Sequence, residues 1–324
     1  MKKNLIIGAG QLGSRHLQGL LKLTQKQVVY VLDPSSGSLE VAEKRANEIG
    51  HSHSVNYISD WNKLPKELDL VIVATGANVR EKVITQLLLG HKVNKLVLEK
   101  ILFQDIESYH KIGLLLQKTN TPTWVNHPRR MLSHYQQVKK ELVKAKGKIV
   151  FQVVGGNWGL ACNSLHFIDL CSFLSGEVVE ELDLDWLDNS IHKSKREGNI
   201  EFTGSIKGKM KDNSSFIITS FDKEVSDISI SVSTSSQRWV IQEGSAQKII
   251  HFSKYNGFQE VITSFTTEFQ STLTTKIAND LFEFGNSSLP TYEEACLSHI
   301  PFIKASIKKY IEITGIETNT CPIT

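Results

Sequence analysis

The 324-residue sequence lacks features that would point to several classes of protein. Its four cysteines form no C-x-x-C pair, which argues against a zinc finger and a disulfide framework. Lys and Arg total 37 against 34 Asp and Glu, so a net charge of +3 favours neither a nucleic-acid groove nor an anionic membrane surface. No apolar run approaches the roughly 20 residues that span a bilayer, and the apolar N-terminal run is too short for a signal peptide. We therefore expect a cytoplasmic protein that binds neither nucleic acid nor membrane.

Metal ligands are also scarce in the sequence. The pair His51-x-His53 has no third ligand nearby and lies in a Ser-containing connection. A metal site needs three or four ligands, so the sequence predicts none.

A glycine-rich turn near the N-terminus is the most informative motif that is present. Residues 4–7 have strand character and lead into Gly8-x-Gly10-x-x-Gly13, after which a helical pattern begins. Such a turn lets the backbone approach a pyrophosphate, and the helix N-terminus offers N–H groups to it. A strand–turn–helix in another kind of α/β protein would look the same. The residues expected to bind a dinucleotide here are Gly8, Gly10, Gln11, Leu12 and Gly13.

The second strand-like run, residues 27–32, ends at Asp33, about twenty residues after Gly13. An acidic side chain at this position accepts hydrogen bonds from the adenosine ribose and repels a 2′-phosphate. No Lys or Arg lies between Asp33 and Glu43 to neutralise such a phosphate. The sequence therefore predicts NAD as the cofactor in preference to NADP. A role for Asp33 in the turn before Pro34 is compatible with this prediction.

The distribution of strands and helices predicts two domains. Residues 1–125 alternate the two, which indicates a doubly wound parallel sheet of the Rossmann type. The expected strands are 4–7, 27–32, 54–58, 68–74, 95–98 and 123–125, and the expected helices include 38–49 and 105–118.

Residues 126–324 have a different pattern, with strand-like runs separated by turns between about 148 and 252. This pattern predicts an α+β domain with a large, mostly antiparallel sheet that is open on one face, followed by helices at 257–284 and 292–310. We expect this domain to bind the substrate. An open face needs cover, so we also expect a homodimer or homotetramer that forms through this sheet.

Lys100 follows the predicted strand at 95–98 and is a candidate catalytic residue. Ligands of doubly wound sheets bind beyond the carboxyl ends of the strands, where an amine can stabilise a developing alkoxide. A solvated surface lysine would explain the position equally well.

Asn163, His166 and Asp169 lie three residues apart and share one face of a predicted apolar helix. A general base oriented by neighbouring polar groups would explain this stripe. So would a buried, hydrogen-bonded core histidine.

The glycine turn followed by Arg15-His16, the pair Glu99-Lys100 and the motif His166-x-x-Asp169 together resemble the Gfo/Idh/MocA family of glucose–fructose oxidoreductases and inositol dehydrogenases. The resemblance extends over nearly the whole chain. It implies that Lys100 and His166 are the catalytic residues. It places Thr75, Asn78 and Glu99 at the cofactor, and Lys100, Arg129, Asn163, His166 and Asp169 at the substrate.

The sequence departs from the family pattern at three positions. Ile101 stands where the family has proline after the lysine, so the backbone there lacks the constraint of a proline ring. Cys162 stands where an aspartate often precedes the histidine, and Arg80 stands where a histidine often follows the Asn78 loop.

The resemblance implies an NAD(P)-dependent oxidoreductase that transfers a hydride between nicotinamide and a secondary alcohol or ketone of a sugar, polyol or nucleotide sugar. Two alternatives stay open. One is a lyase or glycosidase that recycles bound NAD. The other is a non-catalytic relative that senses NAD or a sugar, which the departures at Ile101 and Cys162 favour and the presence of Lys100 and His166 opposes.

Overall fold

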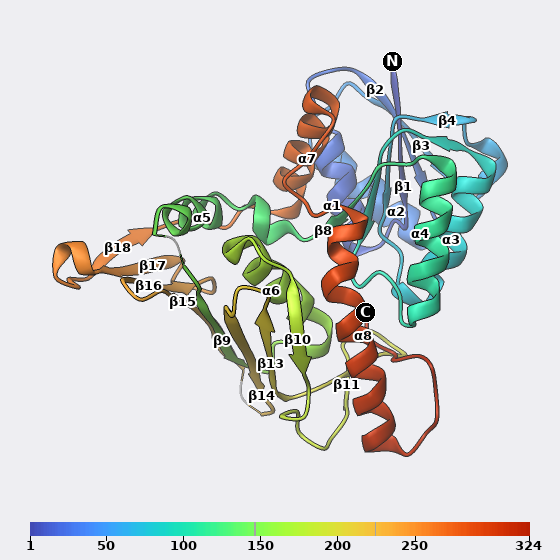
Figure 1. Ribbon diagram of the computed structural model, residues 1–324. Coiled ribbons are helices and arrows are strands. Elements are labelled where there is room, and N and C mark those ends of the chain that lie inside the picture. Colours follow the sequence, from blue (N-terminus) through green and yellow to red (C-terminus); the bar gives the residue numbers. More distant parts are fainter. Residues whose placement is uncertain (146, 224) are drawn as a thin grey trace. The chain divides into compact units, whose positions relative to one another are not determined.

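A computed structural model describes residues 1–145, 147–223 and 225–324 (Figure 1). The chain forms two units, each of which is described here by itself. The first unit contains Met1–Phe103, Glu107–Pro128 and Glu268–Ala295. The second unit contains Gln104–Ile106, Arg129–Thr267 and Cys296–Thr324.

The first unit is built on a six-stranded parallel sheet in the order β3-β2-β1-β5-β7-β8. The strands are β1 (Lys2–Ile7), β2 (Gln27–Leu32), β3 (Ser54–Ile58), β5 (Leu70–Val73), β7 (Leu96–Glu99) and β8 (Thr123–Asn126). Their apolar, largely β-branched residues are buried because helices cover both faces of such a sheet. The predicted doubly wound parallel sheet is confirmed.

Helices connect these strands as the alternating pattern predicts. They are α1 (Gln11–Leu20), α2 (Ser36–Asn47), α3 (Ala77–Gly90) and α4 (Ile106–Thr119). The Ser35 hydroxyl caps α2 by accepting the N–H of Ser38 at 3.2 Å. A short parallel pair, β4 (Glu67–Leu68) and β6 (Lys92–Val93), and the turn η1 (Trp61–Lys63) complete the crossovers.

Helix α7 (Gln270–Phe284) comes from late in the sequence but belongs to the first unit. It lies beside α1, and the Thr275 hydroxyl donates to the Gly19 carbonyl at 2.8 Å (Figure 1). This contact covers one side of the helix that follows the glycine turn.

The second unit contains an eight-stranded sheet in the order β10-β13-β14-β9-β15-β16-β17-β18. The strands are β9 (Val150–Gly156), β10 (Val179–Asp183), β13 (Gly204–Met210), β14 (Ser215–Phe221), β15 (Ser226–Ser233), β16 (Gln237–Gln242), β17 (Lys248–Ser253) and β18 (Val261–Ser264). Every pairing is antiparallel except that of β9 with β14, which confirms the predicted mostly antiparallel sheet. Along β9, Phe151 and Val153 are buried, whereas Val150 and Val154 are exposed.

Helices and short elements complete the second unit. They are η2 (Pro128–Met131), α5 (Ser133–Ala145), α6 (Leu160–Ser175), the pair β11 (His192–Lys193) and β12 (Ile200–Glu201), η3 (Lys254–Asn256) and α8 (Tyr292–Thr314). Pro128 at the start of η2 and the first residues of α8, up to Ala295, belong to the first unit. Among the described residues, the helices include none with the length and apolar character needed to cross a bilayer.

The helix predicted over 257–284 is wrong in its first half. Gly257 adopts a φ of 68° and ends η3, after which β18 pairs with β17 as the edge strand. The β-branched run Val261-Ile262-Thr263 favours a strand over a helix, so α7 starts only at Gln270.

Candidate functional site

The glycine turn lies between β1 and α1 at the carboxyl edge of the first sheet. A Cβ on Gly13 would lie 1.7 Å from the Gly8 carbonyl oxygen, so only glycine lets α1 pack this closely on the turn. A Cβ on Gly10, in contrast, would meet no described atom within 4 Å, so the turn is open on that side. Within the described chain, no side chain caps the start of α1. An open turn at an uncapped helix N-terminus fits the pyrophosphate of a dinucleotide.

Asp33 lies directly beside this turn. Its Oδ2 accepts the Ala9 N–H at 2.7 Å and its Oδ1 accepts the Ser35 N–H at 2.8 Å. A carboxylate oxygen has two lone pairs, so each oxygen retains capacity for a ribose hydroxyl.

Arg45 is a cation at the glycine turn that the sequence reasoning missed. Its guanidinium donates to the Gln11 carbonyl at 3.0 Å, to the Ser14 hydroxyl at 2.5 Å and to the Gln11 side-chain oxygen. Arg45 lies just beyond the stretch from Asp33 to Glu43, which contains no Lys or Arg. Its long side chain reaches the first turn of α1. This contact depends on the packing of α2 against α1, which the local sequence does not reveal.

Thr75 follows β5 next to the glycine turn, since a Cβ on Gly8 would lie 3.0 Å from the Thr75 nitrogen. The Thr75 hydroxyl is buried and has no hydrogen-bond partner among the described residues. A buried hydroxyl without a partner costs free energy, so this atom also fits a bound ligand. Asn78 lies in the first turn of α3 and is exposed.

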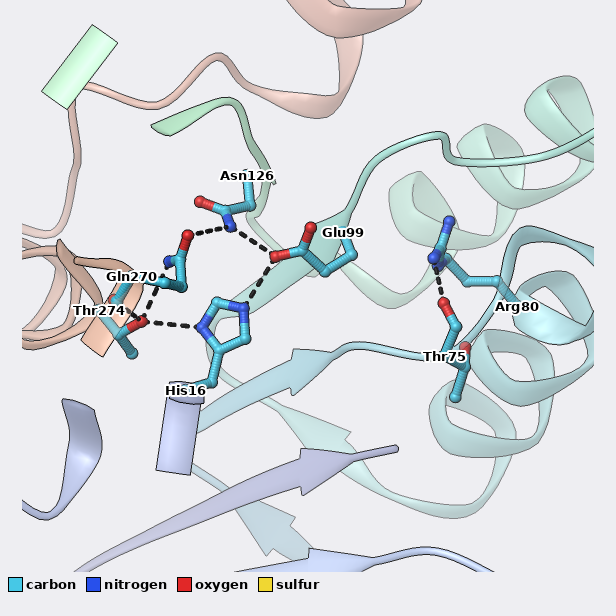
Figure 2. A network of polar contacts seen from close by, with 7 residues as sticks. All are labelled: His16, Thr75, Arg80, Glu99, Asn126, Gln270 and Thr274. Carbon is cyan, nitrogen blue, oxygen red and sulfur yellow. Dashed lines mark hydrogen bonds and ion pairs between the residues drawn. The ribbon is translucent and has the colours of Figure 1, made fainter. Parts of the chain in front are cut away.

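Figure 2 shows the buried network around Glu99, the last residue of β7. His16 Nε2 lies 2.8 Å from Glu99 Oε1, and the Asn126 amide donates to the same oxygen. Burial raises the pKa of Glu99, but the hydrogen bond and charge of His16, with the bond from Asn126, lower it below its usual range. Glu99, expected at the cofactor, thus has protein partners and stays ionised next to Lys100.

The other side of the His16 ring contacts α7. His16 Nδ1 lies 2.8 Å from Thr274 Oγ1, and the Thr274 hydroxyl donates to the Gln270 carbonyl at 2.8 Å (Figure 2). Both ring nitrogens of His16 therefore have a polar partner, Glu99 on one side and Thr274 on the other.

Lys100 leaves β7 directly after Glu99 and is mostly buried, with 9% of its surface exposed. The peptide bond between Lys100 and Ile101 is cis. Arg80, from the first turn of α3, donates to the Leu102 carbonyl at 2.9 Å and also to the Ile101 and Thr75 carbonyls. The segment that carries Lys100 is therefore bonded on both sides.

In the second unit, α6 carries the predicted polar stripe. Asn163 donates to the Trp158 carbonyl at 2.9 Å, and Asp169 accepts two bonds from Arg130, from Nε at 2.8 Å and from Nη2 at 2.7 Å. Burial raises the pKa of Asp169, and the charge of Arg130 offsets part of that rise. His166 is half-buried on the same helix.

Arg129 forms a second buried ion pair in this unit. Its Nε and Nη2 donate to the two carboxylate oxygens of Glu243 at 3.0 and 2.7 Å, and its guanidinium lies 4.1 Å from the centre of the Phe167 ring. The Tyr135 hydroxyl donates to the same Glu243 at 2.6 Å. Arg129 and Asp169, both expected at the substrate, thus each have a protein partner that the sequence did not reveal.

The structure brings one set of expected residues together within each unit. Beyond the strand ends of the first sheet lie the glycine turn, Asp33, Thr75 and Lys100, and α6 in the second unit carries Asn163, His166 and Asp169. Among the described residues, no group of three or more His, Cys, Asp or Glu side chains is arranged to hold a metal ion.

The family comparison concerns the N-terminal part of the chain. Residues 2–127 match the family model GFO_IDH_MocA, described as an oxidoreductase family with an NAD-binding Rossmann fold. No curated protein matches the chain.

Solved structures resemble nearly the whole chain at low identity. A putative NADPH-dependent oxidoreductase from Desulfitobacterium hafniense has a TM-score of 0.75 at 15% identity, covering 96% of both chains. Scyllo-inositol dehydrogenase from Lactobacillus casei, with bound NAD(H) and scyllo-inositol, has a TM-score of 0.67 at 15% identity, covering 94% of this chain and 96% of that one. The transcriptional regulator Gal80p from Kluyveromyces lactis has a TM-score of 0.71 at 13% identity, covering 96% and 92%. At these identities the likeness shows a shared fold.

Proposed function

We propose, on the premise that the N-terminal domain of this chain belongs to the Gfo/Idh/MocA family of NAD-binding oxidoreductases, that the protein is a dehydrogenase or reductase of carbohydrates. The substrate would be a secondary alcohol, or the corresponding ketone, of a sugar, polyol or nucleotide sugar. The solved scyllo-inositol dehydrogenase, whose structure holds a polyol, supports this substrate class.

One observation carries the proposal. The carboxyl edge of the first sheet presents an open glycine turn, an acidic residue at the end of β2, a partnerless Thr75 hydroxyl and Lys100 beyond β7. This edge is where doubly wound sheets bind dinucleotides. Lys100 follows β7, which lies two strands from β1 and the glycine turn. This position supports a place for Lys100 at the reacting end of such a ligand.

The chain supplies binding, orientation and proton transfer. Gly8, Gly10, Gln11, Leu12 and Gly13 would hold the pyrophosphate, and Asp33 the ribose hydroxyls. His166 would take the hydroxyl proton of the substrate as general base, and the Lys100 ammonium would stabilise the developing alkoxide. The bound nicotinamide supplies the hydride chemistry.

Substitution of the two proposed catalytic residues tests the function. We expect Lys100→Met and His166→Ala to bind NAD⁺ normally in calorimetric titration and to lose about 10²–10⁴-fold in turnover on a panel of sugars and polyols. Lys82→Met, on the exposed side of α3, and His110→Ala, exposed on α4, are matched controls. Wild-type turnover in either catalytic variant would remove that residue from the proposed mechanism.

A sensor of NAD or a sugar is the second candidate function. The ion pairs Arg129–Glu243 and Arg130–Asp169 favour it, because they engage two charged side chains expected at a substrate. The resemblance to the regulator Gal80p agrees with it. NAD⁺ binding without turnover of any compound in the panel would support the sensor over the enzyme.

A further inference from the structure

Arg80 is fully buried, and its guanidinium reaches the loop that carries Lys100. The geometry points to Arg80 as a positioning residue for Lys100. This inference rests on the proposed function, because Lys100 is the group that is positioned. Arg80 itself would touch neither substrate nor cofactor.

The hydrogen bonds of Arg80 join two loops at the carboxyl edge of the first sheet. Two of its acceptors, the Ile101 and Leu102 carbonyls, follow Lys100 directly, with the Leu102 bond at 2.9 Å. The third acceptor is the Thr75 carbonyl, next to the glycine turn (Figure 2). One planar side chain therefore fixes the loop after β7 relative to the loop after β5.

The loop needs this support because of its own sequence. Ile101 has no ring to fix its φ, so the covalent chain does not restrict the backbone after Lys100 as a proline would. Ile101 and Leu102 are both fully buried, and their carbonyls need donors. The guanidinium donates to all three carbonyls from a rigid fork, whereas lysine has a single ammonium on a flexible stem.

Lys100 is thus fixed at two neighbouring points. On one side, the Glu99 carboxylate is held by His16 and Asn126; on the other, the Ile101 carbonyl is held by Arg80. Loss of Arg80 would release the second point and leave the first intact. A misplacement of about 1 Å of a reacting group costs on the order of 10²-fold in rate, so the effect should fall on turnover.

The inference can be tested with Arg80→Lys, which keeps the charge, and Arg80→Met, which keeps only the length of the side chain. Lys82→Met, on the exposed side of the same helix, is the matched control. We expect kcat to fall about tenfold in Arg80→Lys and about 10²-fold in Arg80→Met, while KM and the Kd for NAD⁺ stay within about threefold of wild type.

A second measurement needs no cofactor and no substrate. Amide hydrogen exchange of the unliganded protein should accelerate in residues 99–103 and 74–78 of both Arg80 variants, and stay unchanged in β2 and in the control. If Arg80→Met does not fold, Arg80→Lys still provides both measurements.

Three results would overturn the inference. The first is a wild-type kcat in every Arg80 variant that folds. The second is a loss of NAD⁺ binding that parallels the loss of kcat. The third is hydrogen exchange that accelerates throughout the first unit, which would indicate a general role in folding. Failure of the proposed function is distinguishable, because it would show as absence of turnover in the wild-type protein, and the exchange measurement would still test the contacts of Arg80. Normal turnover in the Arg80 variants together with an inactive Lys100→Met would contradict the positioning role alone.

Discussion

At the scale of single residues, we expect the choice between NAD and NADP to depend on one carboxylate, Asp33, and its surroundings. Asp33 is held in place by the N–H groups of Ala9 and Ser35, so its charge is fixed beside the glycine turn. Arg45 also brings a positive charge to the first turn of α1. We therefore expect discrimination against NADP to depend on the repulsion of a 2′-phosphate by Asp33.

We expect Asp33→Asn to narrow the preference for NAD⁺ over NADP⁺ by about tenfold, because the substitution removes the negative charge but keeps an acceptor oxygen. Calorimetric titration with both cofactors measures the ratio of their Kd values. Asp60→Asn is the matched control, since Asp60 also accepts an N–H two residues ahead, from Asn62 at 2.9 Å. An unchanged ratio would show that Asp33 does not face the ribose.

Residue identity alone could not have shown which side chains have partners. The resemblance predicts Thr75, His166 and Lys100 at the site, and their roles stay proposals. Arg129 and Glu243 lie 114 positions apart in the chain, and no periodicity relates them. The same holds for Arg45, whose partners lie on another helix.

At the scale of secondary structure, the buried network around His16 and Glu99 connects four elements of the first unit. His16 comes from α1, Glu99 from β7, Asn126 from β8, and Gln270 and Thr274 from α7. A buried carboxylate is stable in its charged form only with such partners, so the elements depend on one another.

The pH dependence of stability follows from this network. The pKa of Glu99 is lower in the folded protein than in the unfolded chain, so Glu99 contributes stability above its unfolded pKa of about 4.3, and this contribution is lost as the pH falls through the folded value. We expect Glu99→Gln to lower the free energy of unfolding at pH 7 by about 1–3 kcal/mol. The difference from wild type should shrink in acid.

Urea unfolding at a series of pH values measures this difference. Glu67→Gln, which removes an exposed carboxylate paired with Lys92, is the control and should change stability little at any pH. A Glu99→Gln variant whose loss of unfolding free energy is the same at all pH values would contradict a lowered pKa of Glu99 in the folded protein.

The elements of the first sheet were predictable because apolar strands alternate with helices and glycine marks the first turn. The boundary between strand and helix within residues 257–284 was not predictable, because the helical spacing of apolar residues in α7 continues into the β-branched run before it. That run becomes β18 because it pairs with β17, a contact that local sequence does not encode.

At the scale of the whole molecule, we propose that two copies associate through the open face of the second sheet. Val150 and Val154 on the central strand β9 are 44% and 40% exposed, and Ile217 of the neighbouring strand β14 lies on the same face. Val240 of β16 lies on this face too, with Ser231 of β15 between it and β9. Exposed apolar side chains on an open sheet face mark a surface for association.

We expect wild-type protein to sediment as a dimer or tetramer and Val154→Glu to sediment as a monomer, because the substitution buries a charge in the contact. Val143→Glu is the control, as Val143 is 62% exposed on α5. A wild-type monomer, or an oligomer that Val154→Glu leaves intact, would contradict the proposed surface.

The return of α7 to the first unit has a consequence for biosynthesis. A ribosome that has translated the glycine turn and all six strands still has to translate residues 127–269 before it reaches the helix that covers α1. The eight-stranded sheet of the second unit leaves the ribosome before α7 does. Nascent chains usually complete their domains from the N-terminus onward, but here the nucleotide-binding unit is completed after the sheet encoded downstream of it.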